Sequence, residues 1–145
     1  MNALNHFSAP KELIVKSTTN NLSVVRDFVK SAALEAGADD AAIDKIILAV
    51  DEACTNVIKH AYKYSPEGEI NVSVRTDNNK FVIEITDQGI IFDPYGIPEP
   101  DIKKYYKERR VGGLGMFLMK KLMDEVNYMN VAGNRNRVRL VKYLS

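Results

Sequence analysis

The sequence contains a single cysteine, Cys54, so no disulfide can form within the chain. This composition suits a reducing compartment, and we expect a cytoplasmic protein. Apolar residues at helical spacing surround Cys54, which indicates a buried and chemically inert side chain.

Long hydrophobic runs are also missing. The longest, Ile46 to Val50, is far shorter than the roughly 20 apolar residues of a membrane-spanning helix, and the chain does not begin with a basic segment followed by an apolar stretch. The formal net charge is only +1, from 20 Lys and Arg against 19 Asp and Glu. Such a balance gives no overall field that would attract nucleic acid or an anionic membrane, so we expect neither as a partner.

The composition is that of an ordinary soluble globular protein, with 46% apolar and 27% charged residues. A chain of 145 residues builds one hydrophobic core, so we expect residues 1–145 to form a single domain. The spacing of apolar residues predicts helices at 22–35, 40–61 and 114–125, and strands at 12–17, 69–76, 80–86, 126–131 and 137–143.

Capping residues support the first two helices. Side-chain oxygens at positions 18–20 can cap the first helix, Gly37 ends it, and Asp39 or Asp40 can cap the second. Residues 77–79 join two strands into an antiparallel hairpin. The elements together predict an α+β fold, a two-layer sandwich of a mixed, mostly antiparallel sheet with helices on one face.

Glu52 and Asn56 are four residues apart, which places both on one face of the second helix. Mg²⁺ prefers oxygen ligands and usually keeps several waters, so the carboxamide oxygen of Asn56 could hold it. Glu52 then stays free to accept a proton from an attacking hydroxyl, as a general base does in phosphoryl transfer. Taken alone, the pair also fits two solvated helix residues.

Asp87 stands at the end of a predicted strand and is followed by Gln88 and Gly89. A carboxylate there could accept a hydrogen bond from an exocyclic amine such as N6 of adenine, and Gly89 would let the backbone come close to a ligand. Asp and Gly are also common turn formers, so an ordinary turn is the alternative.

Gly112, Gly113 and Gly115 precede the last helix. Free backbone N–H groups at a helix start suit phosphate oxygens, although glycines here can also serve only as flexible links. The preceding segment 90–110 combines several prolines with a dense run of charges, which is typical of a surface segment. Within it, Arg109 or Arg110 either closes over a γ-phosphate or belongs to a solvated surface.

Other nucleotide-binding and metal-binding patterns are absent from the sequence. There is no G-x-x-x-x-G-K-[ST] loop, Gly113 and Gly115 lack the third glycine of a dinucleotide fingerprint, and the H-R-D and D-F-G motifs of protein kinases do not occur. His6 and His60 have no partner at zinc spacing, so no zinc site is predicted.

The order Glu52-x-x-x-Asn56, Asp87-x-Gly89 and Gly113-Leu114-Gly115 resembles the N, G1 and G2 boxes of the GHKL ATPase superfamily, which includes histidine kinases, gyrase B and MutL repair proteins. The likeness covers nearly the whole chain and is closer to bacterial anti-sigma factor serine kinases, which look similar over residues 51–62, 87–94 and 112–126 as well. This resemblance implies a Bergerat-type ATP-binding fold that uses ATP and Mg²⁺.

Matched positions carry the implied roles. Glu52 would be the general base, Asn56 the Mg²⁺ ligand, Asp87 the adenine contact with Gly89 beside it, and Gly113, Leu114 and Gly115 the phosphate loop. Two positions depart from the pattern: Ile91 occupies the second glycine of D-x-G-x-G, and Asn136 stands where relatives often have a threonine that contacts the nucleotide pocket.

The resemblance also implies partners. Members of this branch bind a sigma factor and phosphorylate a serine on a small anti-anti-sigma protein of the STAS class, often as homodimers. We therefore expect an ATP-dependent protein serine kinase. The altered residues at positions 91 and 136 keep open an ATP-sensing module that switches partners without catalysis. A histidine kinase catalytic domain is a third alternative, but no helical segment bearing a phosphoacceptor histidine precedes the first strand.

Overall fold

The computed structural model of this chain describes residues 8–91 and 114–144, with the side chains of residues 114–116 outside the description. Within these ranges the strands form one five-stranded sheet in the order β1-β2-β3-β5-β4. The strands are β1 Lys11–Lys16, β2 Glu69–Asp77, β3 Lys80–Asp87, β4 Glu125–Val131 and β5 Arg135–Tyr143. Each neighbouring pair is antiparallel, so the described sheet is antiparallel throughout rather than mixed.

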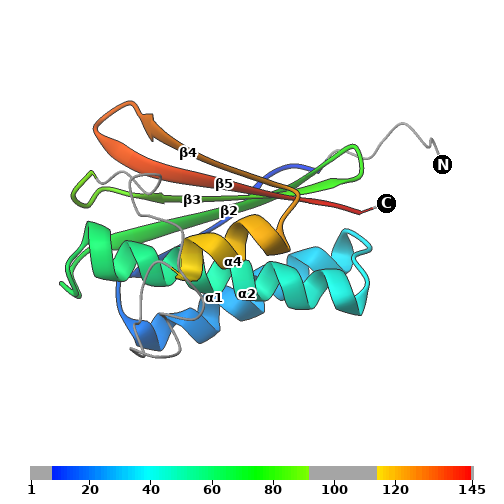
Figure 1. Cartoon of the computed structure of the whole chain (residues 1–145), viewed down its shortest axis with the longest axis horizontal. Helices are drawn as coiled ribbons and strands as arrows, with labels where there is room; N and C mark the ends of the chain where they lie inside the picture. The colour runs from blue at the N-terminus through cyan, green and yellow to red at the C-terminus, as the bar shows by residue number, and fades with distance from the viewer. Residues whose placement is uncertain (1–7, 92–113, 145) are drawn as a thin grey trace.

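The helices lie together on one face of this sheet (Figure 1). They are α1 Leu22–Glu35, α2 Asp40–Asn56 and α4 Leu114–Leu122, and a π-helical turn, η2 Val57–Ala61, continues α2. Helix α2 packs against both α1 and α4 and is therefore the central helix of the layer. The predicted two-layer α+β sandwich is confirmed.

Alternating side chains of the strands supply the core. On β2, Ile70, Val72 and Val74 are buried against the helices, while the residues between them face the opposite side of the sheet. Helix α2 contributes the broad apolar face that the sequence predicts. Its buried residues include Ile43, Ile46, Val50 and Cys54. The core therefore fixes which face of β3 and β5 points toward the helices.

The caps are only partly as predicted. Asp39 caps α2, because its carboxylate accepts a hydrogen bond from the backbone N–H of Ala42 at 2.8 Å. Gly37 follows α1 with a φ of +89°, as a terminating glycine does. The predicted cap at positions 18–20 is wrong. A 3-10 turn, η1 Thr19–Asn21, leads directly into α1 in helical conformation, so the residue before α1 lacks the extended backbone that a side-chain cap needs.

Two element boundaries also differ from the prediction by two or more residues. Helix α4 ends at Leu122 rather than near residue 125, because Asp124 already donates its backbone N–H to Val141 of β5 at 2.9 Å. Strand β5 begins at Arg135, two residues earlier than predicted, and thereby brings Asn136 into the sheet. No described helix is long and apolar enough to cross a membrane.

Candidate functional site

The candidate site lies where β3 ends beside the start of β5. Asp87, the last residue of β3, pairs with Asn136 of β5 across the antiparallel ladder. Because paired residues share a face, and Ile85 and Val138 two positions away belong to the core, Asp87 and Asn136 point toward the helix layer. Both are polar residues buried between the sheet and the helices.

Asp87 is a buried carboxylate with one oxygen engaged. The residue is only 2% exposed. Its Oδ1 accepts hydrogen bonds from the Gly89 backbone N–H and from Asn136 Nδ2, both at 2.9 Å. Burial raises the pKa of Asp87 above its usual value, while these two donors oppose the rise. Within the described ranges Oδ2 accepts no hydrogen bond, which leaves an acceptor for a ligand.

Asn136 holds both Asp87 and the segment that follows it. Its Nδ2 donates to Asp87 Oδ1 and also, at 3.1 Å, to the backbone carbonyl of Ile90. The side chain is 6% exposed. Only the resemblance pointed to Asn136, because the expected strand began after it. The alternation of arginines from Arg135 onward was the sequence signal for the longer strand.

Gly89 is required by a contact within the protein. A Cβ at this position would lie 2.4 Å from the carbonyl oxygen of Ala61 and 2.8 Å from its Cβ, closer than real Cβ atoms approach. The backbone N–H of Ile90 donates to the same Ala61 oxygen at 2.7 Å. The sequence predicted a close approach to a ligand here. The structure shows a close approach to the end of the π-helical turn, and the approach to a ligand stays a prediction.

We expect Gly89→Ala to lower the free energy of unfolding by about 2–3 kcal/mol, because the new methyl group would collide with backbone atoms that cannot rotate away. Chemical denaturation of the variant measures this loss. Gly37→Ala is the matched control. It has a positive φ but no neighbouring atom within 4 Å of the position that a Cβ would take, so only the backbone cost of about 1 kcal/mol is expected. Equal losses in the two variants would contradict the proposed collision.

Glu52 is half-buried on α2 and differs from its neighbour Asp51. The two carboxylate oxygens of Asp51 accept hydrogen bonds from Arg26 Nη1 at 3.0 and 3.1 Å, and these bonds connect Asp51 to α1. Glu52 makes no hydrogen bond or ion pair in the described part of the chain. Burial first, and then the nearby Asp51 charge, raise the pKa of Glu52 above its usual value, while Lys59 lowers it. A carboxylate with these properties is suited to accept a proton.

Asn56 is one helical turn further along α2. Its residue is only 8% exposed, and its carboxamide makes no hydrogen bond to any residue that the structure describes. Every fully buried side-chain polar atom among the described residues has a hydrogen-bond partner. The amide atoms of Asn56 have no such partner there, so they are not fully buried and account for part of the remaining exposure of the residue. Asn56 lies five residues before Ala61, which corresponds to about 7 Å along a helix axis. The Asn56 amide makes no hydrogen bond to the described residues and lies near the Asp87 loop. Its oxygen is therefore suited to bind a metal ion, including one that is also bound to phosphate.

The phosphate-binding part of the predicted site is described only in part. Gly113, Arg109 and Arg110 lie outside the described residues, and so does the side chain of Leu114. The backbone of α4 does begin at Leu114, as predicted, and α4 packs on α2. Ile91, at the second glycine position, is described and exposed, and its φ is not positive, so its side chain introduces no backbone strain.

Tyr62 belongs to this region and was missed as a functional candidate. Its hydroxyl donates to the Glu69 carbonyl at 2.6 Å and accepts from the Gln88 backbone N–H at 2.9 Å. We call this pair of hydrogen bonds the Tyr62 bridge. The sequence signal was a tyrosine placed directly after the end of the central helix, which spacing alone does not distinguish from an ordinary surface tyrosine.

Cys54 has the inert character predicted for it. The side chain is fully buried, and burial, with the Asp51 charge as a smaller cause, raises the pKa of the thiol to about 12. The thiolate is therefore not populated near neutral pH. Met119 and Met123 are also buried in the core.

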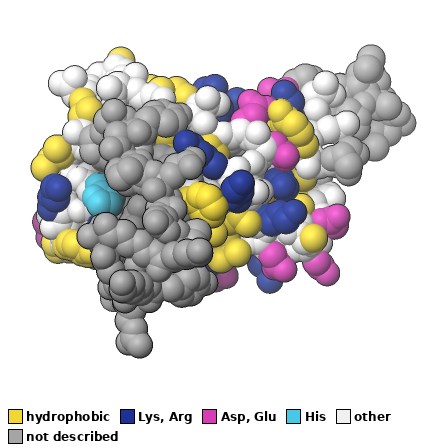
Figure 2. Space-filling view, viewed as in Figure 1, with side chains coloured by type: hydrophobic (Ala, Val, Ile, Leu, Met, Phe, Trp, Pro, Cys, Tyr) yellow, Lys and Arg dark blue, Asp and Glu magenta, His cyan; other side chains and the backbone are white. Residues whose placement is uncertain are grey.

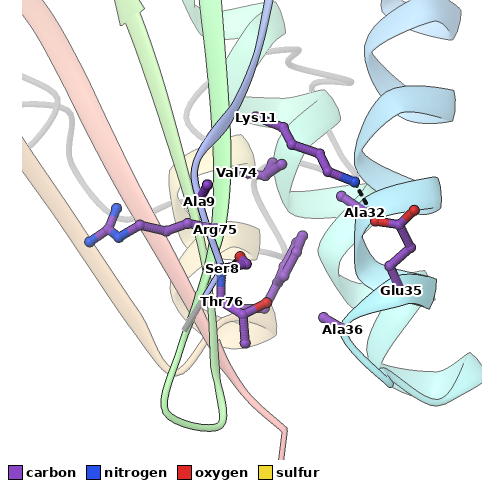
Figure 3. Close-up of a pocket in the computed structure, with 10 residues that line it drawn as sticks. Ser8, Ala9, Lys11, Ala32, Glu35, Ala36, Val74, Arg75 and Thr76 are labelled. Atoms are coloured by element: carbon purple, nitrogen blue, oxygen red, sulfur yellow. Dashed lines mark hydrogen bonds and ion pairs between the residues drawn. The ribbon is translucent and has the colours of Figure 1, made fainter. Parts of the chain in front are cut away.

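A cavity of about 150 Å³ lies elsewhere, between the segment before β1 and the end of α1 (Figure 3). Ala32, Val74 and Phe81 are among its apolar lining residues, and Lys11 pairs with Glu35 beside it. Phe81 and Asp87 stand near opposite ends of β3, so this cavity is separate from the candidate site. Figure 2 shows acidic and basic side chains intermixed over the coloured part of one face.

Comparisons with known proteins agree with this arrangement. The histidine kinase-like ATPase domain family matches residues 15–142. The serine-protein kinase RsbW of Bacillus subtilis is 31% identical over 139 residues, covering 92% of this chain and 85% of that protein. RsbW of Staphylococcus aureus strain Newman is 34% identical over 139 residues, with 92% and 86% covered. RsbW of Listeria monocytogenes is 36% identical over 109 residues, with 72% and 69% covered.

Solved structures show the same fold. The crystal structure of the RsbU and RsbW domains of a Mycobacterium tuberculosis protein matches with a TM-score of 0.67 and 20% identity, over 94% of this chain and 32% of that chain. The SiaB-SiaC complex from Pseudomonas aeruginosa matches with a TM-score of 0.62 and 11% identity, over 94% of this chain and 89% of that chain. At these identities the two structures support the fold alone. The family match, together with relatives above 30% identity over most of their length, shows that this chain belongs to the histidine kinase-like ATPase domain family and confirms its resemblance to the serine-kinase branch.

Proposed function

We propose that this protein is an Mg-ATP-dependent protein serine kinase that binds a sigma factor and phosphorylates a serine of a STAS-class anti-anti-sigma protein. The observation that carries the proposal is the placement of Glu52 and the nearly buried Asn56 one turn apart on the central helix, both without a hydrogen-bond partner among the described residues. Sequestering a sigma factor and forming a homodimer are parts of the proposal that rest on the resemblance.

The described residues fit an adenine nucleotide and a hard metal ion. Asp87 offers one carboxylate oxygen to an amine donor, and Asn56 offers one amide oxygen to Mg²⁺. ATP, when bound, supplies the phosphoryl group that is transferred. Glu52 accepts the proton of the attacking serine hydroxyl, a task for which its raised pKa suits it. Leu114 and Gly115 begin the helix whose N-terminal amides would face phosphate.

The names of the relatives support kinase activity. Proteins called serine-protein kinase RsbW share 31% to 36% of their aligned residues with this chain. A second function, an ATP-sensing module without catalysis, is favoured by one observation. Asn136 directs its amide donor at Asp87, so the nucleotide pocket has a different hydrogen-bond set from one built with threonine.

A phosphotransfer assay tests the proposal. The protein is incubated with γ-labelled ATP, Mg²⁺ and each STAS-domain protein of the source genome, and acid-stable phosphoserine on one of them is the expected product. Omitting the STAS protein and replacing Mg²⁺ with EDTA are the controls, and both should abolish the product.

The other outcomes separate the alternatives. Nucleotide-dependent binding or release of a STAS protein without label transfer would replace the kinase by the sensing module. Acid-labile label on this chain itself would indicate a histidine kinase. Failure to bind Mg-ATP at all would overturn both forms of the proposal.

A further inference from the structure

We propose that Tyr62 is a positioning residue. It fixes the position of the loop that starts at Asp87 relative to the helix that carries Glu52 and Asn56. The inference rests on the proposed function, because it assigns Tyr62 a part in nucleotide binding. It concerns a residue that touches the Asp87 loop through its hydroxyl group and is not itself expected to contact the transferred phosphoryl group.

The Tyr62 bridge joins two strands to the end of the central helix. The hydroxyl accepts a hydrogen bond from the N–H of Gln88, the residue that follows Asp87, at 2.9 Å. The same hydroxyl donates to the carbonyl of Glu69, the first residue of β2, at 2.6 Å. Both partners are backbone groups, so the bridge fixes the path of the main chain on either side of the site.

The tyrosine ring is held in place by its own close contacts. A Cβ on Gly68 would lie 2.4 to 2.5 Å from three atoms of the Tyr62 ring, so the ring rests directly on the backbone that enters β2. Only glycine permits this approach without moving the ring. Because the ring is packed closely against Gly68, its hydroxyl has a defined position and can fix the position of the Gln88 N–H.

Adjacent contacts fix the same loop from the neighbouring residue. The carbonyl of Ala61 accepts from Ile90 N–H at 2.7 Å, and Gly89 packs against it. Ala61 ends the π-helical turn, and Tyr62 N–H donates to the carbonyl of Val57, five residues earlier, at 3.0 Å. A π-turn inserts one extra residue into a helix and often accompanies a functional site. Here it sets the direction in which Tyr62 leaves the helix.

Two other tyrosines provide matched controls. Tyr64, two residues later, is 64% exposed and makes no hydrogen bond through its hydroxyl in the described part of the chain. Tyr143 does make one, donating to Glu125 Oε2 at 2.7 Å, but it pairs with Lys80 at the opposite end of β3 from Asp87. Tyr143→Phe therefore removes a comparable hydrogen bond far from the site.

The test compares Tyr62→Phe with Tyr64→Phe and Tyr143→Phe in the full chain. In the nucleotide-free protein, the Gln88 amide should exchange with deuterium about tenfold faster in Tyr62→Phe, because it loses its acceptor, and at an unchanged rate in the controls. Calorimetry should show a dissociation constant for Mg-ATP about tenfold higher in Tyr62→Phe alone.

A second nucleotide distinguishes positioning from general loss of structure. Purine riboside triphosphate lacks the 6-amino group that Asp87 is proposed to contact, so Tyr62→Phe should weaken its binding much less than that of ATP. Equal weakening of both nucleotides, or an unchanged exchange rate at Gln88, would overturn the positioning role. Wild-type protein that binds no Mg-ATP would instead overturn the proposed function, while the exchange rate would still decide whether the Tyr62 bridge orders the loop.

Discussion

Replacing Glu52 with glutamine lowers the rate of phosphoryl transfer to the partner serine by about 10²–10⁴-fold, the range typical for loss of a general base. The dissociation constant for Mg-ATP should change by less than about threefold, since a base acts in the transition state rather than in ground-state binding. Glutamine keeps the length and shape of the side chain but cannot accept the serine proton. Rapid-quench transfer assays and calorimetry measure the two quantities separately.

The surroundings of Glu52 let this variant test the role of the base without disturbing other contacts among the described residues. Glu52 has no hydrogen-bond or ion-pair partner in the described residues, so the substitution breaks no contact there, whereas Asp51 next to it is tied to Arg26. Glu67→Gln, on the exposed turn before β2, is the matched control and should leave transfer unchanged. Transfer by Glu52→Gln at the wild-type rate would remove Glu52 from the role of base.

The pH dependence of transfer follows from the same residue. Glu52 acts as a base only when it is ionised, and burial beside Asp51 raises its pKa above 4.5. The rate should therefore fall on acidification through a pH above that ordinary value, and it should reach a plateau as the pH rises past the raised pKa. A pH–rate profile at saturating Mg-ATP shows where this acidic limb lies.

Local sequence patterns predicted most of the fold. Helix α1 was predicted with its observed ends, because apolar spacing and Gly37 both mark it, and Asp39 was one of the two residues predicted to cap α2. The cap before α1 failed because the 3-10 turn places a helical residue directly before it, and helical propensity does not reveal such a turn. The early end of α4 depends on Asp124 pairing with β5, which is a contact that helical spacing does not encode.

The candidate site was predictable in its residue types but not in its internal contacts. Glu52 and Asn56 follow from helical spacing, whereas the pairing of Asp87 with Asn136 depends on the register of two strands separated by α4 and β4. Gly89 illustrates the limit well. A glycine signals a close approach, but only the tertiary structure shows that the neighbour is the carbonyl of Ala61.

We expect Asp87→Asn to raise the dissociation constant for Mg-ATP by about 100-fold, the loss expected when a hydrogen bond to a charged acceptor is replaced by an unfavourable contact. In the variant, the amide oxygen can take the place of Oδ1, where it still accepts from Gly89 N–H and Asn136 Nδ2. The amide nitrogen then replaces Oδ2. A donor would thus face the ligand where the wild type presents an acceptor, while the fold is retained.

This exchange of acceptor for donor makes a prediction about base preference that loss of stability cannot mimic. Inosine triphosphate carries a 6-oxo acceptor in place of the 6-amino donor, so Asp87→Asn should bind it better than the wild type does, even as ATP binding weakens. Calorimetry with both nucleotides measures the two changes. Asp77→Asn, at the far end of β2, should alter neither. If both nucleotides weaken equally in Asp87→Asn, the carboxylate supports the pocket without reading the base, because only direct contact with position 6 of the purine gives opposite signs.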